Sequence, residues 1–131
     1  MIRILFGIPY DLPKINAEAA LSNLVISGKI EQAKDFHEEH KENKLYNFSE
    51  EAFNKFGYSC LKSSNIQAAI EIFKWNVEMH PKSSNVYDSL GEAYLKNGDT
   101  SKALEFYTIS YSMDPKNKNA KEKINELKKN R

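Results

Sequence analysis

Residues 84–117 read SNVYDSLGEAYLKNGDTSKALEFYTISYSMDPKN, and this stretch decides the fold because its pattern also occurs 34 residues earlier. Aromatic, apolar, Gly, Ala and Pro residues take matching places in the two copies. The matched pairs are Phe53 and Tyr87, Gly57 and Gly91, Leu61 and Leu95, Ala69 and Ala103, Phe73 and Tyr107, and Pro81 and Pro115. A fixed period of this length indicates stacked structural repeats.

Each copy has the pattern of two helices. Apolar and small residues at i, i+3, i+4 and i+7 give the first helix one inward face, made by Tyr87, Leu90, Gly91 and Tyr94. Gly98 then suits the end of this helix, and Asp99 is a predicted N-cap for the next one. Ser49 is the predicted N-cap of the earlier copy, and Pro115 ends the later one.

The order Tyr87-x-x-Leu90-Gly91-x-x-Tyr94, followed by Ala103, Tyr107 and Pro115, resembles the tetratricopeptide (TPR) repeat. This resemblance implies an all-α fold, a right-handed superhelix of antiparallel helix pairs. Both copies depart from the family where its second helix usually carries another alanine, because Asn76 and Ser110 stand there.

The repeat register divides the chain. We expect a linker segment at residues 1–13, a degenerate helix pair at 14–48, repeats at 50–83 and 84–117, and a capping helix at 118–131. The separation from Ala33 to Ala69 is 36 residues, so an insertion is predicted between Asn43 and Asn47. Three helix pairs and a capping helix reach the number of repeats, about three, that a stable stack of this kind usually requires.

Composition excludes several functions. The 131 residues carry 19 Lys and Arg against 18 Asp and Glu, so a net charge of +1 gives no case for nucleic acid or an anionic membrane. Basic residues are concentrated in residues 116–131, so an acidic partner, if the chain has one, is expected to bind there. Cys60 is the only cysteine, which excludes intrachain disulfides and zinc sites made of cysteines. The start, Met1 to Phe6, is too short for a signal peptide, and a cytoplasmic location is predicted.

Two short motifs resemble catalytic or metal-binding patterns. Ser59-Cys60-Leu61-Lys62 matches the S-x-x-K nucleophile motif but lies inside a repeat helix without the motif's partners. His37 and His40, at i and i+3, could share a metal, but no third ligand follows at a suitable spacing. We therefore predict no enzyme activity, no metal and no cofactor.

The TPR resemblance implies a concave groove lined by the first helices, which accepts peptides. The residues predicted to line it are Asn54, Lys55, Tyr58, Lys62, Asp88, Ser89, Glu92 and Lys96. The family's best-known groove clamps a peptide's C-terminal carboxylate with a Lys and an Asn, and Asn54 and Tyr58 occupy those places here. This departure argues against the clamp and leaves a groove of mixed charge, or an ordinary solvated face.

The second helices carry more apolar residues than one inner face needs. Their extra residues form a predicted outer interface, made by Ile72, Trp75, Phe106 and Ile109. Met79 and Met113 are expected in the core. Trp75 and Ile109 are expected to lie outside it, so we expect another segment or protein to shield their side chains from water. The candidates are the apolar segment Ile2 to Pro9, a second copy of the chain in a homodimer, or another domain.

Residues 48–58, 69–78 and 81–94 also resemble a narrower group, the TPR tail of β-lactamase-related serine hydrolases and some esterases. Phe6 to Pro13 resembles the junction with their catalytic domain, which this sequence lacks. The sequence thus predicts a non-catalytic module that binds a peptide or protein. The alternative is an accessory domain of such a hydrolase, which would be exported if the hydrolase is secreted.

Overall fold

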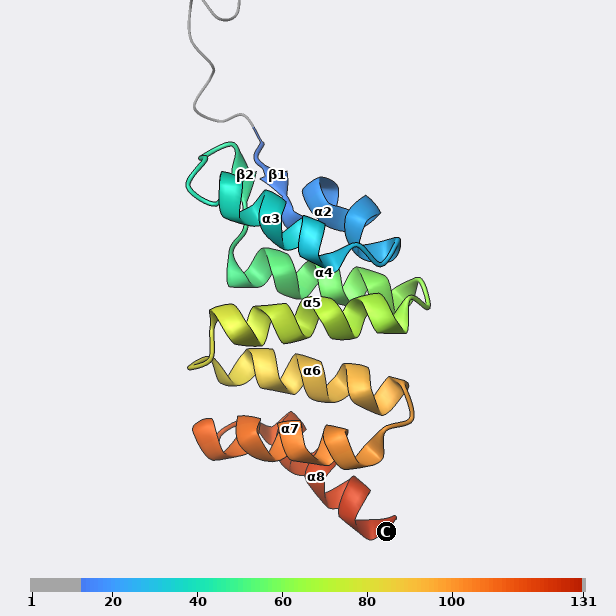
Figure 1. Cartoon of the computed structure of the whole chain (residues 1–131). Helices are drawn as coiled ribbons and strands as arrows, with labels where there is room; N and C mark the ends of the chain where they lie inside the picture. Colours follow the sequence, from blue (N-terminus) through green and yellow to red (C-terminus); the bar gives the residue numbers. More distant parts are fainter. Residues whose placement is uncertain (1–12, 131) are drawn as a thin grey trace, which may run out of the picture.

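The structure, a computed structural model, describes residues 13–130 and is mostly helical over them, as the sequence predicted (Figure 1). Nearly all of the predicted linker and the apolar segment Ile2 to Pro9 lie outside the described residues. The elements, in chain order, are β1 (Ile15–Asn16), α2 (Ala17–Ile26), α3 (Ile30–His40), β2 (Tyr46–Asn47), α4 (Glu50–Lys62), α5 (Ile66–Met79), α6 (Ser84–Lys96), α7 (Thr100–Met113) and α8 (Lys118–Lys129).

The helices form a stack in which each packs on the next. From α4 onward, α4 contacts α5, α5 contacts α6, α6 contacts α7, and α7 contacts α8. The ribbon reverses its direction at each short turn along this series (Figure 1). Helix α4 also contacts α6, so the first helices of the two repeats lie side by side. At the N-terminal end, α2 packs on α3, α4 and α5.

Local capping residues set where the helices begin and end. The side chain of Ser49 accepts a hydrogen bond from the Ala52 amide at 3.2 Å, and that of Asp99 accepts one from the Lys102 amide at 3.1 Å. Both predicted N-caps are therefore confirmed. Gly98 has φ +84°, the left-handed conformation that ends a helix at little cost in glycine.

Two glycines allow the helices of each repeat to approach closely. A Cβ atom at Gly57 would overlap the ring of Phe73, and one at Gly91 would lie 3.2 Å from the ring of Tyr107. Both rings are buried, so each fills the space that its glycine leaves. The matched pairs in the sequence thus correspond to matched ring contacts in the core.

The buried polar residues of the second helices repeat one hydrogen bond. Asn76 Nδ2 donates to the Glu50 carbonyl at 3.1 Å, and Ser110 Oγ donates to the Ser84 carbonyl at 2.8 Å. Glu50 and Ser84 open the first helices of their repeats. The side chains of Asn76 and Ser110 therefore tie the second helix of each pair to the start of the first.

The predicted insertion contains a short strand. β2 pairs in parallel with β1, with Ile15 opposite Tyr46 and Asn16 opposite Asn47. Sequence analysis predicted no strand, because two residues are too few to show an alternating pattern. The pairing joins the start of α2 to the segment that leads into α4.

Candidate binding face

Polar side chains of α4 and α6 form a hydrogen-bonded chain across the two helices. Ser89 Oγ donates to Asn54 Oδ1 at 2.6 Å. Tyr58 Oη lies 3.2 Å from Glu92 Oε1 and 3.4 Å from Ser89 Oγ, and its single proton is within reach of both acceptors, with Glu92 the nearer. Ser89 is buried, whereas the other three side chains are half-buried. These four predicted groove residues are therefore brought together.

A second group of hydrogen bonds joins α6 to the start of α8. Asn117 Nδ2 lies 2.9 Å from Asp88 Oδ2 and 3.0 Å from Ser110 Oγ, and Asn119 Nδ2 donates to Asp88 Oδ1 at 3.0 Å. Asn117 also caps α8, because its Oδ1 accepts from the Ala120 amide at 3.1 Å. We call the two groups together the polar face, which consists of Asn54, Tyr58, Asp88, Ser89, Glu92, Asn117 and Asn119.

The hydroxyl of Tyr107 lies beneath the polar face. The residue is 0% exposed, and its hydroxyl is without a hydrogen-bond partner among the described residues. Burial raises the pKa of Tyr107, and the negative charges of Glu92 and Asp88 raise it further. Its counterpart in the earlier repeat is Phe73, which carries no hydroxyl and packs edge-on against Tyr58.

The polar face is acidic at its centre. Asp88 and Glu92 accept hydrogen bonds from neutral groups, and neither forms an ion pair within residues 13–130. Burial raises the pKa of Tyr58 to about 12, so this phenol stays protonated at neutral pH and remains a donor to Glu92. The chemistry available here is acceptance of hydrogen bonds and of positive charge.

The three predicted groove lysines lie outside this network. Lys55 forms an exposed ion pair with Glu51 at 3.3 Å. Lys62 and Lys96 are exposed at the C-terminal ends of α4 and α6. The predicted mixture of charges is thus separated in space, with the carboxylates central and the lysines at the margins.

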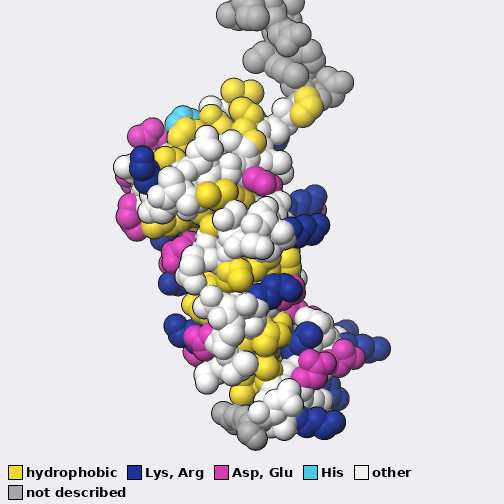
Figure 2. Space-filling view, turned by 90° about the vertical axis from the view of Figure 1, so that its right-hand side faces the viewer, with side chains coloured by type: hydrophobic (Ala, Val, Ile, Leu, Met, Phe, Trp, Pro, Cys, Tyr) yellow, Lys and Arg dark blue, Asp and Glu magenta, His cyan; other side chains and the backbone are white. Residues whose placement is uncertain are grey.

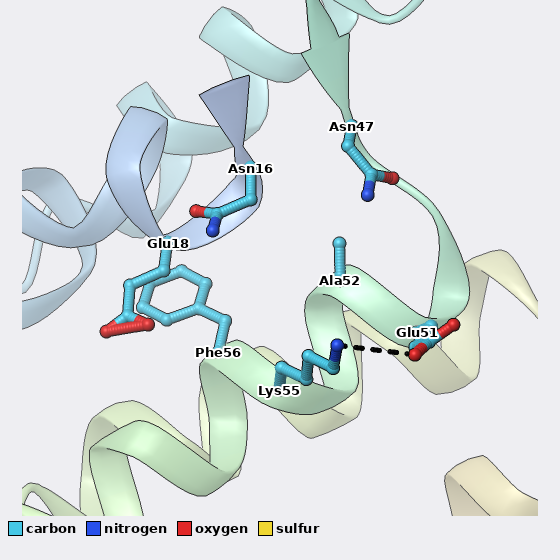
Figure 3. A pocket seen from close by; sticks show the side chains of 7 residues that line it. All are labelled: Asn16, Glu18, Asn47, Glu51, Ala52, Lys55 and Phe56. Carbon is cyan, nitrogen blue, oxygen red and sulfur yellow. Dashed lines mark ion pairs between the residues drawn. The ribbon is translucent and has the colours of Figure 1, made fainter. Parts of the chain in front are cut away.

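A pocket of about 280 Å³ lies between the start of α2 and α4 (Figure 3). It is lined by Asn16, Glu18, Asn47, Glu51, Ala52, Lys55 and Phe56. In Figure 3, Lys55 and Glu51 lie along one side of the pocket, and Asn16 and Glu18 project from the opposite side. Lys55 is three residues before Tyr58 on α4, so the pocket and the polar face share one stripe of that helix.

The predicted outer interface needs correction. Trp75 is 4% exposed and Ile72 is 0% exposed, and residues of α3 and α4 pack on Trp75. The ring of Trp75 packs edge-on against His37 at 5.4 Å and against Phe53 at 4.8 Å. The prediction that Trp75 needs a cover from another segment or protein is therefore wrong.

The corresponding residues of α7 are less covered. Phe106 is half-buried and stacks on Tyr94, with ring centroids 5.5 Å apart. Ile109 is half-buried, and Met113, which was expected in the core, is 40% exposed. Only the α7 half of the predicted outer interface is thus open to solvent.

His37 and His40, the pair considered for metal binding, both pack against aromatic rings. The His37 ring lies between Phe48, Phe53 and Trp75, and its burial lowers its pKa. His40 stacks on Phe36 at 4.1 Å. Within residues 13–130 there is no group of three or more His, Cys, Asp or Glu placed to hold a metal.

The residues of the S-x-x-K motif show ordinary helical surroundings. Ser59 is half-buried on α4, and Lys62 is exposed at the end of the same helix. Between them Cys60 is buried, and burial raises the pKa of its thiol to about 11, so the thiol is protonated at neutral pH.

A cleft lined by both apolar and polar residues lies at the other end of the helices. Figure 2 looks onto the turns that follow α2, α4 and α6, and hydrophobic side chains are visible between polar ones on this side. A cleft of about 620 Å³ there includes Val25, Ile26, Ile30 and Ile66. Ile26 is 53% exposed.

Over residues 13–130, none of the helices has both the length and the apolar character needed to cross a membrane.

No protein-family model matches this sequence, and no curated protein matches it. Three residues of this region, Asn117, Asn119 and Tyr107, are not among those predicted from the sequence to line the groove. Continuing the period of 34 residues from Asn85 would have reached Asn119, whereas the hydroxyl of Tyr107 gave no separate signal because its ring was assigned to the core.

Proposed function

We propose that this chain is a non-catalytic protein-binding module that binds an extended peptide segment across the polar face. The observation that carries this proposal is a pair of neighbouring hydrogen-bonded groups, one that joins Asn54 on α4 to Ser89 on α6 and one that joins Asp88 on α6 to Asn117 and Asn119 at the start of α8. Together they join helices that are distant in the sequence and present their polar groups on one surface.

The fixed geometry of the hydrogen-bonded side chains of the polar face favours binding. Side chains already held by hydrogen bonds lose little conformational freedom when a partner arrives. The half-buried acceptors of Asn54, Asp88 and Glu92 can take N–H donors, which every peptide backbone supplies.

The dimensions suit a short extended peptide. Packed helices are about 8–10 Å apart, so a path from the pocket beside α2 across α4 and α6 to α8 is roughly 25–30 Å long. An extended chain advances about 3.3 Å per residue, so roughly eight to nine residues would cross it. We therefore expect the peptide to span the pocket of Figure 3 and the polar face together.

The test is binding of random 12-residue peptides on an array by the purified full chain. Tyr58→Phe combined with Ser89→Ala removes the hydroxyls that link α4 to α6, and we expect the affinity for bound peptides to fall about tenfold. Glu105→Gln is the matched control, because Glu105 is exposed on α7 and takes part in none of the hydrogen bonds or ion pairs found within residues 13–130. Absence of any bound peptide, or an equal loss in the control, would overturn the proposal.

The hydrolase alternative has less support. Its expected contact with a catalytic domain included Trp75, and that side chain is covered by α3. Homodimer formation through the same face loses its central residue for the same reason. Peptide binding is thus the function that the described side chains favour.

A further inference from the structure

We infer that the polar face binds a cationic side chain, a lysine or arginine of the partner peptide, between Asp88 and Glu92 and above the hydroxyl of Tyr107. This inference rests on the proposed function and adds the chemical class of the partner. Asp88 and Glu92 offer acceptors to such a cation, and neither carboxylate has an ion-pair partner within residues 13–130.

The two carboxylates have unused acceptor capacity. Asp88 receives one amide N–H on each oxygen, and Glu92 receives only the Tyr58 hydroxyl, within the described part of the chain. Each carboxylate oxygen can accept two hydrogen bonds. Both side chains are half-buried, so water screens their charges less than it would on an open surface. A cation placed between them would therefore be bound more strongly than at an exposed carboxylate.

The chain's own lysines do not neutralise this centre. Lys123 on α8 is paired with Glu126 at 3.6 Å, and Lys55 is paired with Glu51 at 3.3 Å. Lys62 and Lys96 are exposed at the ends of α4 and α6 and take part in no ion pair of residues 13–130. The negative charge of Asp88 and Glu92 is thus left for a partner.

The buried hydroxyl of Tyr107 also favours a hydrogen-bonding ligand at this place. Its side chain is fully buried, its hydroxyl has no partner within residues 13–130, and the charged groups that act on it are carboxylates of α6 and α8. A phenol can donate its proton to a carboxylate while its oxygen accepts an N–H. A lysine ammonium offers three N–H donors and an arginine guanidinium offers five, so either can use both carboxylates and the phenol oxygen.

An anionic ligand does not fit the same place. A peptide carboxylate would be repelled by the negative charges of Asp88 and Glu92, and the donors beside them, Tyr58 Oη, Asn117 Nδ2 and Asn119 Nδ2, are neutral and already bonded to these carboxylates. Asn54 and Tyr58 are also already engaged with Ser89 and Glu92. The expected ligand is therefore opposite in charge to the one held by the carboxylate clamp of the TPR groove.

The test is selection of peptides from a random 12-residue library by the full chain, followed by affinity measurements. We expect selected peptides to share a lysine or arginine at one position, and replacement of that residue by norleucine to weaken binding at least tenfold. Asp88→Asn and Glu92→Gln should each lower affinity for the basic peptide about tenfold, whereas Glu105→Gln should leave it unchanged. Tyr107→Phe should lower it about fivefold and leave the norleucine peptide unaffected.

The outcomes separate this inference from the proposed function. Peptides that bind at the polar face without a shared basic residue would overturn the inference and leave the proposed function standing. Failure to select any peptide would overturn both. Circular dichroism of each variant, together with unchanged affinity for the norleucine peptide, would show that a loss reflects the missing charge or hydroxyl rather than unfolding.

Discussion

Replacing Tyr107 with phenylalanine should make the unliganded chain more stable. The hydroxyl of Tyr107 is buried without a partner among the described residues, and a buried unsatisfied polar group costs about 1–3 kcal/mol. Phe73 occupies the equivalent place in the earlier repeat and packs on its glycine without a hydroxyl. Removing the Tyr107 hydroxyl therefore keeps the ring contact with Gly91 and removes the cost.

The expected gain is about 1–2 kcal/mol in the free energy of unfolding, which raises Tm by roughly 4 °C per kcal/mol for a domain of this size. Urea and thermal denaturation followed by circular dichroism would measure both quantities. Tyr87→Phe is the matched control, because the Tyr87 hydroxyl donates to the Pro81 carbonyl at 2.9 Å. Its loss should destabilise the chain by about 0.5–1.5 kcal/mol. A loss of stability in Tyr107→Phe as large as in the control would refute the reasoning.

Three further predictions test packing and ionisation. Gly57→Ala should cost about 1–3 kcal/mol because its new methyl overlaps the buried Phe73 ring, whereas Gly91→Ala should stay within about 1 kcal/mol of wild type because better helix propensity offsets a milder contact. Urea denaturation would distinguish them, and equal costs would contradict this packing. Trp75→Ala should cost about 3–5 kcal/mol without changing the mass in solution, since its cover lies within the chain. A change in the oligomeric mass with unchanged stability would contradict the burial of Trp75 within the chain. Stability should fall as pH drops below 6.5, because the folded chain favours neutral His37 and the unfolded chain takes up the proton more readily. His37→Gln should flatten this pH dependence, and an unaltered profile in the variant would refute the assignment.

The repeat explains how much of the fold could be predicted. Matched residues such as Gly57 and Gly91 fixed the two helix pairs, and Ser49 and Asp99 fixed where helices begin. The cover on Trp75 could not be predicted from its own helix. It comes from α3, whose sequence departs from the 34-residue period and gives no register for side-chain contacts.

The candidate site shows a similar division. Periodicity placed Asn54, Tyr58 and Glu92 on the first helices, and they do share one network. The contribution of Asn117 was missed because it precedes α8 and reaches Asp88 only through the packing of α7 and α8. A helical pattern indicates which face a residue occupies, but it does not indicate which donor on another element will reach it.

The most direct test of the central claim is backbone NMR of the full chain during titration with a peptide selected from the 12-residue library. Binding across the polar face predicts the largest chemical-shift changes around Asn54, Asp88, Glu92 and Asn119, with smaller changes at the pocket near Lys55. Shift changes confined to the cleft at Ile26 and Ile66 would contradict the claim.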